Sequence, residues 1–477
     1  MIVSPGGAQT SVALDLFDAV DSYKIGGHFL QYPPGTQYVW SYLESRGGAF
    51  AFTRFFGLQE LIRRYLLQPL TRERVEQIVP VMAAHGVPFN RAGFLAIVER
   101  HGGRLPVRIE AVPEGSDIPT GNVVLQVVNT DPAAFWLPSY LETLLMHVWY
   151  TTTVCTLSAS ARAAILAALE RSCDDPFANI DFRLHDFGAR GVSDMYAGAR
   201  GGLAHLVNFL GTDTVPALCW ARAYYHEAMA GFSIPAMEHA TVTTWGRDGE
   251  AAAFRNMLER CGGPGKTIAM VIDSYDAEYA VDQIIGVELR DAILASGSTV
   301  VVRPDSGDPR VIVPALLQAL AKRFGATTNR KGYRVLDPAV RLIQGDGMDL
   351  PAIRALFEVV LAAGFSAENV AVGMGGGLLQ KVNRDTQRWA MKVSAVQIDG
   401  VWSDVYKDPK DDPDKRSKRG RLALVRTARG VETIRLEALG ARENLLRPVY
   451  ENGVLLVDES LAEIRARARQ GDARPIE

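Results

Sequence analysis

One stretch of about sixty residues, which starts at Arg183, concentrates side chains that could do polar chemistry. The stretch contains R-L-H-D-F-G-A-R-G-V-S, then H-L-V-N-F-L-G-T-D-T, and then P-A-M-E-H-A-T-V-T-T-W-G. Its notable side chains are His185, Asp186, Phe187, Arg190, Asp213, Glu238 and His239. A hydrophobic core does not need such groups, and they are costly to bury unless they are paired or used. The stretch therefore predicts a binding site for a charged, planar ligand.

His239 is the candidate for nucleophilic or acid–base chemistry in this stretch. A single histidine is more often structural than catalytic, but this one follows Glu238 and stands among polar residues. A carboxylate beside an imidazole fixes its tautomer and raises its basicity. Asp273 is the expected partner. It directly follows an apolar run, T-I-A-M-V-I, and the α/β barrel predicted below would place it on the same rim as His239.

From Lys266 onward the sequence alternates between short apolar runs, polar loops and helical stretches. The apolar runs are T-I-A-M-V-I, T-V-V-V-R, V-R-L-I and N-V-A-V. Strands that are apolar at every position are typical of a parallel sheet that is buried on both faces. Repeated strand–helix units of this length predict an α/β barrel or a doubly wound sheet.

Polar residues follow each of these predicted strands. Asp273, Arg303, Asp305, Asp346 and the glycines 373–377 all come directly after an apolar run. Asp and Gly are also common helix caps and turn residues, so any one of them has a structural explanation. The strand ends of a parallel sheet share one edge, where ligands bind. The set as a whole therefore predicts a ligand site at that edge.

Two glycine loops suggest that part of this ligand is a phosphate. G-D-G at 345–347 and G-M-G-G-G at 373–377 each lie between a predicted strand and a helix. Exposed backbone N–H groups in such loops can approach an anion. R-P-D-S-G at 303–307 adds an arginine for phosphate oxygens and a carboxylate for ribose hydroxyls or hydrated Mg²⁺. Neither a Walker loop nor a dinucleotide-binding G-x-G-x-x-G occurs at a strand–helix junction.

A basic segment follows the second glycine loop. It contains Lys381, Arg384, Lys392, Lys407, Lys410, Lys415, Arg416, Lys418, Arg419 and Arg421. For most of these residues a solvated loop is the simplest explanation. Interleaved aspartates argue against a nucleic-acid surface, whereas a diphosphate needs several cations at once. We therefore expect some of these residues to bind diphosphate.

Composition excludes several other classes of protein. The chain has 477 residues, a formal net charge of -3 and 48% hydrophobic residues, as expected for a globular protein of two or three domains. The four cysteines form no Cys-x-x-Cys pair, and the N-terminus lacks the pattern of a signal peptide. The most apolar stretch, 135–157, contains Pro138, Glu142 and His147, which favours a buried helix. We expect a cytoplasmic protein that binds neither nucleic acid nor membranes.

Together with further segments, these motifs resemble one known enzyme family nearly end to end. The matching segments are D-S-Y-K (21–24), Q-Y-P-P (31–34), H-D-F-G-A-R-G-V-S, H-L-V-N-F-L-G-T-D-T, E-H-A-T, D-S-Y-D, R-P-D-S-G, Q-G-D-G, G-G-G-L-L-Q-K (375–381) and K-D-P-K-D-D-P-D-K-R-S-K-R-G-R-L. On these residues the chain resembles the nicotinamide phosphoribosyltransferase family, a type II phosphoribosyltransferase family related to nicotinate and quinolinate phosphoribosyltransferases.

The resemblance implies a fold and a reaction. The fold would be an irregular α/β barrel, from residues 181–384, and a mixed α+β domain, from residues 1–180 and 385–477. The mixed domain would contribute to a homodimer interface and to the diphosphate site. The reaction would transfer phosphoribosyl from 5-phosphoribosyl-1-diphosphate to nicotinamide, giving nicotinamide mononucleotide and diphosphate. Mg²⁺, held mainly by diphosphate and water near Asp305, would assist the transfer, and ATP would stimulate it by phosphorylating His239, which Asp273 orients.

The resemblance also implies roles for the binding residues. Phe187 and Tyr23 of the partner subunit would sandwich the pyridine ring, and Asp213 would accept a hydrogen bond from the carboxamide. Arg303 would lie near the amide oxygen and phosphate, and Asp305 would serve the ribose or Mg²⁺. Ribose and 5′-phosphate would contact Arg190, Gly345, Asp346, Gly375 and Gly376. Diphosphate would face Arg46, Arg384, Lys392, Lys407 and Lys415, some of them from the second subunit.

The sequence departs from the family in places. Ala189 stands where a tyrosine is usual, S-D-M-Y-A-G replaces S-S-Q-E-T-A-G, and Met374 replaces a small polar residue. These changes put the shape of the ring pocket in question.

Two alternatives remain open at this point. Nicotinate is the alternative substrate, but the charge of Asp213 favours an amide over a carboxylate. A catalytically silent binding protein is the other alternative, and the retained polar residues argue against it.

Overall fold

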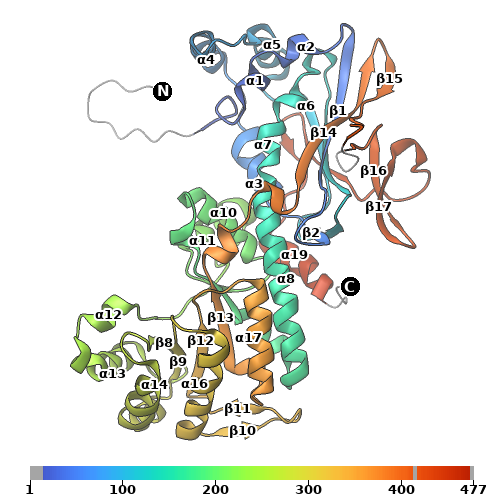
Figure 1. Ribbon diagram of the computed structural model, residues 1–477. Coiled ribbons are helices and arrows are strands. Elements are labelled where there is room, and N and C mark those ends of the chain that lie inside the picture. The colour runs from blue at the N-terminus through green and yellow to red at the C-terminus, as the bar shows by residue number, and fades with distance from the viewer. Residues whose placement is uncertain (1–13, 412–415, 473–477) are drawn as a thin grey trace, which may run out of the picture. The chain divides into compact units, whose positions relative to one another are not determined.

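The computed structural model describes residues 14–411 and 416–472. Contacts between Cα atoms divide the chain into two compact units (Figure 1). The mixed unit contains Met1–Thr153 and Arg384–Ile464, and the barrel unit contains Val154–Asn383 and Arg465–Glu477. The units change between Thr153 and Val154, within helix α8 (Val148–Ser172), whereas the resemblance implied a first boundary after residue 180.

The mixed unit is built on a seven-stranded antiparallel sheet. Its strand order is β15 (Val401–Asp404), β14 (Trp389–Ile398), β1 (Thr36–Ser45), β5 (Val123–Asn129), β3 (Val107–Ala111), β18 (Arg447–Glu451) and β19 (Val454–Leu455). The strands predicted at 37–46, 107–112 and 122–128 are confirmed as β1, β3 and β5. Segments from both ends of the chain thus share one sheet, as the resemblance implied.

Helices from the N-terminal half pack against this sheet. Helix α4 (Arg72–His85) begins at Thr71, whose hydroxyl accepts a hydrogen bond from the Arg74 N–H, and α5 (Arg91–His101) begins at Asn90 in the same way. The apolar side chains of these helices join the strands in one large core, which includes Tyr42, Phe94, Tyr140 and Tyr450.

The barrel unit contains a six-stranded parallel sheet that forms a half-barrel. Its strand order is β7 (Gly211–Thr212), β6 (Leu184–Asp186), β13 (Val370–Met374), β12 (Val340–Gln344), β9 (Thr299–Arg303) and β8 (Thr267–Val271). All of the neighbouring strands are parallel. The four predicted apolar strands are therefore confirmed, and so is the expected fold class, an irregular α/β barrel, here a half-barrel, with a mixed α+β domain.

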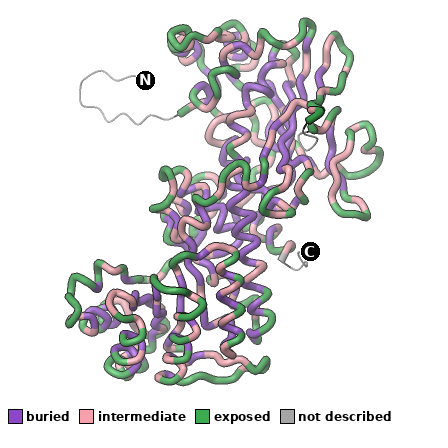
Figure 2. The backbone as a smooth tube through the Cα atoms, in the orientation of Figure 1, coloured by how far each residue is buried: buried purple, intermediate pink, exposed green. Residues whose placement is uncertain are grey.

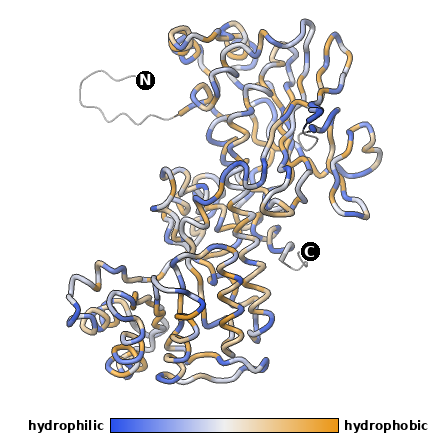
Figure 3. Tube along the Cα trace, viewed as in Figure 1, coloured by the Kyte–Doolittle hydropathy of each residue, from blue (hydrophilic) through white to orange (hydrophobic). Residues whose placement is uncertain are grey.

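Burial explains why these segments form a parallel sheet. In β8, β9, β12 and β13 nearly every residue is buried or partly buried, and Figure 2 shows these strands largely in purple. Figure 3 shows the same strands as hydrophobic. Asp308 and Asp349 immediately precede helices α16 (Pro309–Phe324) and α17 (Leu350–Ala362). Their carboxylates accept hydrogen bonds from backbone N–H groups in the first turns of these helices. These aspartates are thus helix caps, in contrast to the acids that follow the strands directly.

The strand register aligns the chemically interesting residues along one edge. Arg303, the last residue of β9, pairs with Val271, the last residue of β8. Asp186, which ends β6, pairs with Met374 of β13 on one side and with Thr212 of β7 on the other. Residues that immediately follow these strands must therefore emerge at the same edge of the sheet.

The long apolar helical region behaves as the sequence indicated. Among the described residues, Glu142–Ser172 is the helical stretch long and apolar enough to meet the criteria for a membrane span. However, 83% of its most apolar window is buried inside the protein, which is common for core helices. All four cysteines are free, with Cys155 and Cys173 buried.

Candidate functional site

His239 lies between two carboxylates. It begins helix α12 (His239–Thr243), and its Nε2 atom is 3.1 Å from Oδ1 of Asp273, which follows β8. Its Nδ1 atom is 3.9 Å from Oδ2 of Asp305. The Asp273 side chain is only 5% exposed, whereas the His239 side chain is 44% exposed. A buried acid thus orients an imidazole that remains accessible to a reactant.

Asp273 also connects the histidine to the neighbouring strand end. Its Oδ2 atom accepts hydrogen bonds from the Asp305 N–H, at 3.1 Å, and from the Ser306 hydroxyl, at 2.5 Å. Ser306 stands within the R-P-D-S-G motif, but its residue type alone predicted no role for it. The predicted trio His239, Asp273 and Asp305 therefore forms one connected cluster, and Ser306 belongs to it.

A cavity of about 340 Å³ lies in the same unit. Phe187, Asp213 and Arg303, which were predicted to contact the pyridine ring or its amide, all line it. Its apolar wall includes Ala269, Val301 and Ile343, against which Phe187 packs. A mostly apolar cavity with a few polar groups is typical of a site for a small aromatic molecule.

Close packing against glycine holds the Phe187 ring. The Phe187 N–H donates to the Met374 carbonyl at 3.0 Å. A β-carbon on Gly373 would lie 2.0 Å from the ring, and one on Gly345 would lie 3.3 Å from it. Gly345, which was predicted to contact phosphate, thus also borders the aromatic ring, and its β position is 3.6 Å from Oδ1 of Asp305.

The polar groups of the cavity have different surroundings. Asp213 is exposed, and its Oδ1 atom accepts a hydrogen bond from the hydroxyl of Ser233, a residue that the sequence patterns did not single out. Nothing in the local sequence links these two residues, which are twenty positions apart. The Nε atom of Arg303 is buried and has no hydrogen-bond acceptor among the described residues. That N–H is available to an acceptor on a ligand.

The remaining loop residues of the predicted phosphate site lie at the same edge. Gly375 approaches the Phe187 backbone, where a β-carbon would be 3.4 Å from its carbonyl oxygen. Gly376 begins helix α18 (Gly376–Leu379), and Arg190 lies in the short helix η4 (Ala189–Gly191) with an exposed side chain. Asp346 is exposed, directly after Gly345.

The predicted diphosphate residues belong to the mixed unit, where several cations cluster. Arg46 Nε lies 3.1 Å from Oε1 of Glu44. Burial lowers the pKa of Lys392; the charge of Glu142 opposes this shift, whereas Arg46, Lys24 and Lys407 add to it. Several cations therefore lie near Lys392. Lys415 lies outside the described residues.

Two further predicted residues of the mixed unit are solvent-exposed. Arg384 pairs with its neighbour Asp385 at 3.1 Å. Tyr23 lies in helix α1 (Ser22–Ile25) and is 58% exposed, with its ring 5.3 Å from that of His28. An exposed tyrosine of this kind is free to contact another molecule. The candidate residues thus form two groups, one in each unit.

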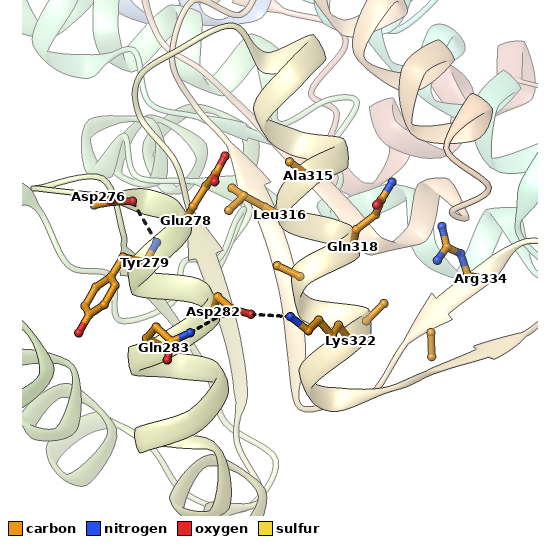
Figure 4. A pocket seen from close by; sticks show the side chains of 13 residues that line it. Asp276, Glu278, Tyr279, Asp282, Gln283, Ala315, Leu316, Gln318, Lys322 and Arg334 are labelled. Carbon is orange, nitrogen blue, oxygen red and sulfur yellow. Dashed lines mark hydrogen bonds and ion pairs between the residues drawn. The ribbon is translucent and has the colours of Figure 1, made fainter.

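The barrel unit also has a larger groove, of about 920 Å³, between η6 (Ala280–Glu288) and α16 (Figure 4). Asp282 on one wall lies 3.7 Å from Lys322 on the other, and Arg323 lowers the pKa of Asp282 to about 2. None of the candidate site residues lines this groove. Its size therefore does not make it the functional site.

Comparisons with known proteins agree with this geometry. Residues 182–454 match the model of the nicotinate phosphoribosyltransferase (NAPRTase) family, and residues 15–109 match the N-terminal domain of nicotinamide phosphoribosyltransferase. The chain is 51% identical over 455 residues to a nicotinamide phosphoribosyltransferase of Xanthomonas campestris, and the match covers 94% of this chain and 97% of the relative. It is 32% identical to one of Acinetobacter baylyi, where the match covers 96% and 98%.

Solved structures share the fold. Human nicotinic acid phosphoribosyltransferase is 19% identical with a TM-score of 0.58, and the match covers 94% of this chain and 92% of that one. A nicotinate-nucleotide pyrophosphorylase from Pyrococcus furiosus is 16% identical with the same TM-score, covering 91% and 89%. The half-barrel, the histidine–carboxylate cluster and the family matches lead to one conclusion: the chain is a pentosyltransferase enzyme that belongs to the nicotinate phosphoribosyltransferase family.

Proposed function

We propose that this enzyme transfers phosphoribosyl from 5-phosphoribosyl-1-diphosphate to nicotinamide, which yields nicotinamide mononucleotide and diphosphate. The names of the two bacterial relatives support this substrate. The observation that carries the proposal is the position of Asp213, an exposed carboxylate that lines the same cavity as Phe187. A stacked pyridine ring on Phe187 would present its substituent to this acid.

Asp213 favours nicotinamide over nicotinate for an electrostatic reason. A carboxylate accepts a hydrogen bond from a carboxamide NH₂ but repels the negative charge of nicotinate. Ser233 donates a hydrogen bond to Oδ1 of Asp213, which orients the carboxylate in the cavity. Nicotinate transfer is the alternative that the family name suggests, and this charge argues against it.

The cluster around Asp305 fits the charge changes of the reaction. The ring nitrogen attacks C1 of the ribose as diphosphate leaves, and positive charge builds on the sugar in the transition state. Asp305 is only 30% exposed, so its negative charge is weakly screened. It can therefore stabilise that transition state. The cations around Lys392 would bind the diphosphate.

Mg²⁺ fits the donors around Asp305 only if the substrate supplies most of its ligands. In the part of the chain that the structure describes, no group of three or more His, Cys, Asp or Glu side chains is arranged to hold a metal ion. Magnesium commonly binds through one or two carboxylates and substrate phosphates. Asp305 is the carboxylate we assign to it. When bound, the ion would stabilise the negative charge of the leaving diphosphate.

We also propose that ATP phosphorylates His239 and thereby stimulates the transfer. Asp273 holds Nε2, so Nδ1 is left as the nucleophilic atom, and it points toward Asp305. A phosphate on this ring would add negative charge beside the carboxylate that we assign to Mg²⁺. That charge can tighten binding of the metal–diphosphate substrate without changing the products.

A homodimer with shared active sites completes the proposal. Large apolar side chains are exposed on α10 (Met195–His205) and α11 (Val215–Tyr225) of the barrel unit, among them Met195, Tyr196 and Val215. Such a surface is typical of an interface. Tyr23 is exposed as well, as a residue that serves the partner's ring site must be.

The transfer is tested by incubating purified protein with 5-phosphoribosyl-1-diphosphate, Mg²⁺ and either base. We expect nicotinamide mononucleotide and an equal amount of diphosphate, with nicotinate a poor substrate. Product from nicotinate but not from nicotinamide would exclude the proposed function in favour of the alternative.

The phosphohistidine is tested by acid-labile labelling from γ-³²P ATP. We expect labelled wild-type protein and unlabelled His239→Ala, while basal transfer without ATP persists in the variant. His85→Ala removes an exposed histidine of the other unit and serves as the matched control. Equal labelling of wild type and His239→Ala would show that the phosphate is attached elsewhere.

A further inference from the structure

Asp186 is a buried carboxyl group that the proposed reaction does not use. It is the last residue of β6, immediately before Phe187, and it is fully buried. A charged group is costly to bury unless its partners offset the cost. The contacts of Asp186 therefore need an explanation.

One set of contacts leads to the residue beneath the pyridine ring. Oδ1 of Asp186 accepts a hydrogen bond from the Gly188 N–H at 2.7 Å. The Phe187 N–H between them donates to the Met374 carbonyl at 3.0 Å. The backbone of Phe187 is thus held from both sides, which fixes the point from which its ring extends toward the cavity, and the close packing against Gly373 confines the ring itself.

A second contact leads to the residue that would select the base. The Asp186 carbonyl oxygen accepts a hydrogen bond from the Asp213 N–H at 2.9 Å. Thr212, the residue before Asp213, pairs with Asp186 in the sheet. Asp186 is therefore bonded on both sides of the cavity, to Gly188 through its carboxylate and to Asp213 through its main-chain carbonyl.

The environment of the second carboxylate oxygen shows how closely this residue is enclosed. A β-carbon on Gly202 of helix α10 would lie 3.0 Å from Oδ2, so the helix approaches the carboxyl closely only because it has glycine there. Burial raises the pKa of Asp186 to about 6, and the nearby Thr214 side chain and the Gly188 N–H oppose that shift. Oδ2 of Asp186 and the Thr214 hydroxyl nevertheless have no hydrogen-bond partner among the described residues, so the bond to the Gly188 N–H is the one that the carboxylate makes there. The charge of Asp213 raises the pKa of Asp186 further.

We infer that Asp186 is a positioning residue for the base, which sets the distance between the ring of Phe187 and the carboxylate of Asp213. This inference rests on the proposed function, because it assumes that a pyridine amide binds between these two residues. Asp186 touches no reacting atom, so its loss should weaken binding of the base more than it slows the chemical step.

Asp186→Ala and Asp186→Asn separate the hydrogen bond from the charge. Alanine removes the acceptor of the Gly188 N–H, whereas asparagine keeps an oxygen at that position. We expect alanine to raise the KM for nicotinamide by about ten- to a hundredfold, since a displacement of about 1 Å has effects of that size. The KM for 5-phosphoribosyl-1-diphosphate should change little, and asparagine should restore most of the base affinity.

Asn369→Ala is the matched control, because Asn369 is also fully buried and makes side-chain bonds to the backbone, to Leu336, Arg334 and Ser366. It precedes β13, at the strand end opposite the site. We expect it to lower the melting temperature without a selective effect on the KM for nicotinamide. If Asp186→Ala fails to fold, Asp186→Leu removes the acceptor of the Gly188 N–H with a side chain of similar size and should raise the same KM.

Two results would overturn the inference. One is a folded Asp186→Ala, or Asp186→Leu in its place, with an unchanged KM for nicotinamide. The other is an equal loss in all kinetic constants that tracks the fall in melting temperature, as in a purely structural role. Failure of the proposed function itself would appear differently, as wild-type protein that makes no nicotinamide mononucleotide.

Discussion

At the scale of single residues, we propose that one acid and one glycine determine how a base lies in the cavity. Asp213 supplies a negative charge at its edge, and Gly373 leaves the space in which the Phe187 ring lies. Each acts by a different physical effect, electrostatic repulsion in one case and close packing in the other. The two effects can therefore be removed separately.

Removing the charge of Asp213 should relax the choice of base. Asp213→Asn keeps the size of the side chain but ends the repulsion of a carboxylate ligand. The wild type should prefer nicotinamide over nicotinate by a few kcal/mol, which is roughly a hundredfold in kcat/KM. The variant should lose most of this preference. Steady-state kinetics with both bases measure it, and comparable kcat/KM values for the two bases in the wild type would refute the role of Asp213.

Filling the space at Gly373 should displace the aromatic ring. A β-carbon there would overlap the Phe187 ring at 2.0 Å, so Gly373→Ala forces the ring to move. We expect the KM for nicotinamide to rise by about tenfold or more, because stacking depends on ring position. Gly347→Ala adds a methyl group where nothing lies within 4 Å, although the backbone there has a φ of +67°. A KM that rises equally in both variants would contradict the packing argument.

At the scale of elements, helix α10 is anchored by a fully buried histidine, His205. Its Nδ1 atom lies 2.9 Å from the Ser158 hydroxyl, and its Nε2 atom lies 3.2 Å from the Gly211 carbonyl. The ring also stacks on Phe209. This packing leaves no solvent to stabilise a charged ring, and burial lowers the pKa of His205 to about 3.

Acidification should therefore loosen α10. The unfolded chain binds a proton at His205 near pH 6.5, while the native state binds it only near pH 3. Above about pH 6.5 His205 is neutral in both states, so its contribution to the free energy of unfolding is fully present. That free energy falls as the pH drops from about 6.5 toward 3, because only the unfolded chain then binds the proton. His205→Gln should be less stable than wild type at pH 7.5 but should lose less stability on acidification.

Urea unfolding of both proteins at pH 7.5, 6.5 and 5.5 tests this prediction, since comparing the two cancels the other titrating groups. His85→Gln, at the exposed end of α4, is the control and should follow the wild type. Parallel pH profiles for wild type and His205→Gln would show that the buried histidine is not the cause.

At the scale of the whole molecule, the candidate residues are divided between two units. The reactive cluster and the base cavity belong to the barrel unit, while Tyr23 and the cations around Lys392 belong to the mixed unit. A shared site in a homodimer would let one subunit supply the first group and its partner supply Tyr23.

Mixing two inactive variants tests this arrangement. After subunit exchange, Tyr23→Ala and Asp305→Ala should regain activity, because one of the two sites in each hybrid dimer carries neither change. A mixture of Phe187→Ala and Asp305→Ala should regain none, since each barrel unit is then altered. Transfer assays after confirmed exchange decide the matter, and no recovery in the first mixture would count against shared sites.

Local patterns in the sequence were enough to predict the architecture and most of the candidate site. The strands 267–271 and 299–303 are mostly apolar, and such short runs are typical of buried parallel strands. Because strand ends share one edge, the sequence pattern alone places Asp273 and Asp305 together. The proximity of His239 to Asp273 was predicted as well, and the separation of 3.1 Å between their side chains confirms it.

The tertiary structure alone decided the contacts between residues far apart in the chain. Three such contacts cannot be predicted from periodicity or composition. They are the hydrogen bond from Ser233 to Asp213, the hydrogen bond from Ser306 to Asp273, and the packing of Gly373 against the ring of Phe187. In the sequence, Asp186 resembles any polar residue at a strand end, and only its burial and its two backbone bonds distinguish it. Local sequence sets which elements form and where they end, but the distance between two side chains depends on how strands and helices pack together. That packing is a property of the whole chain.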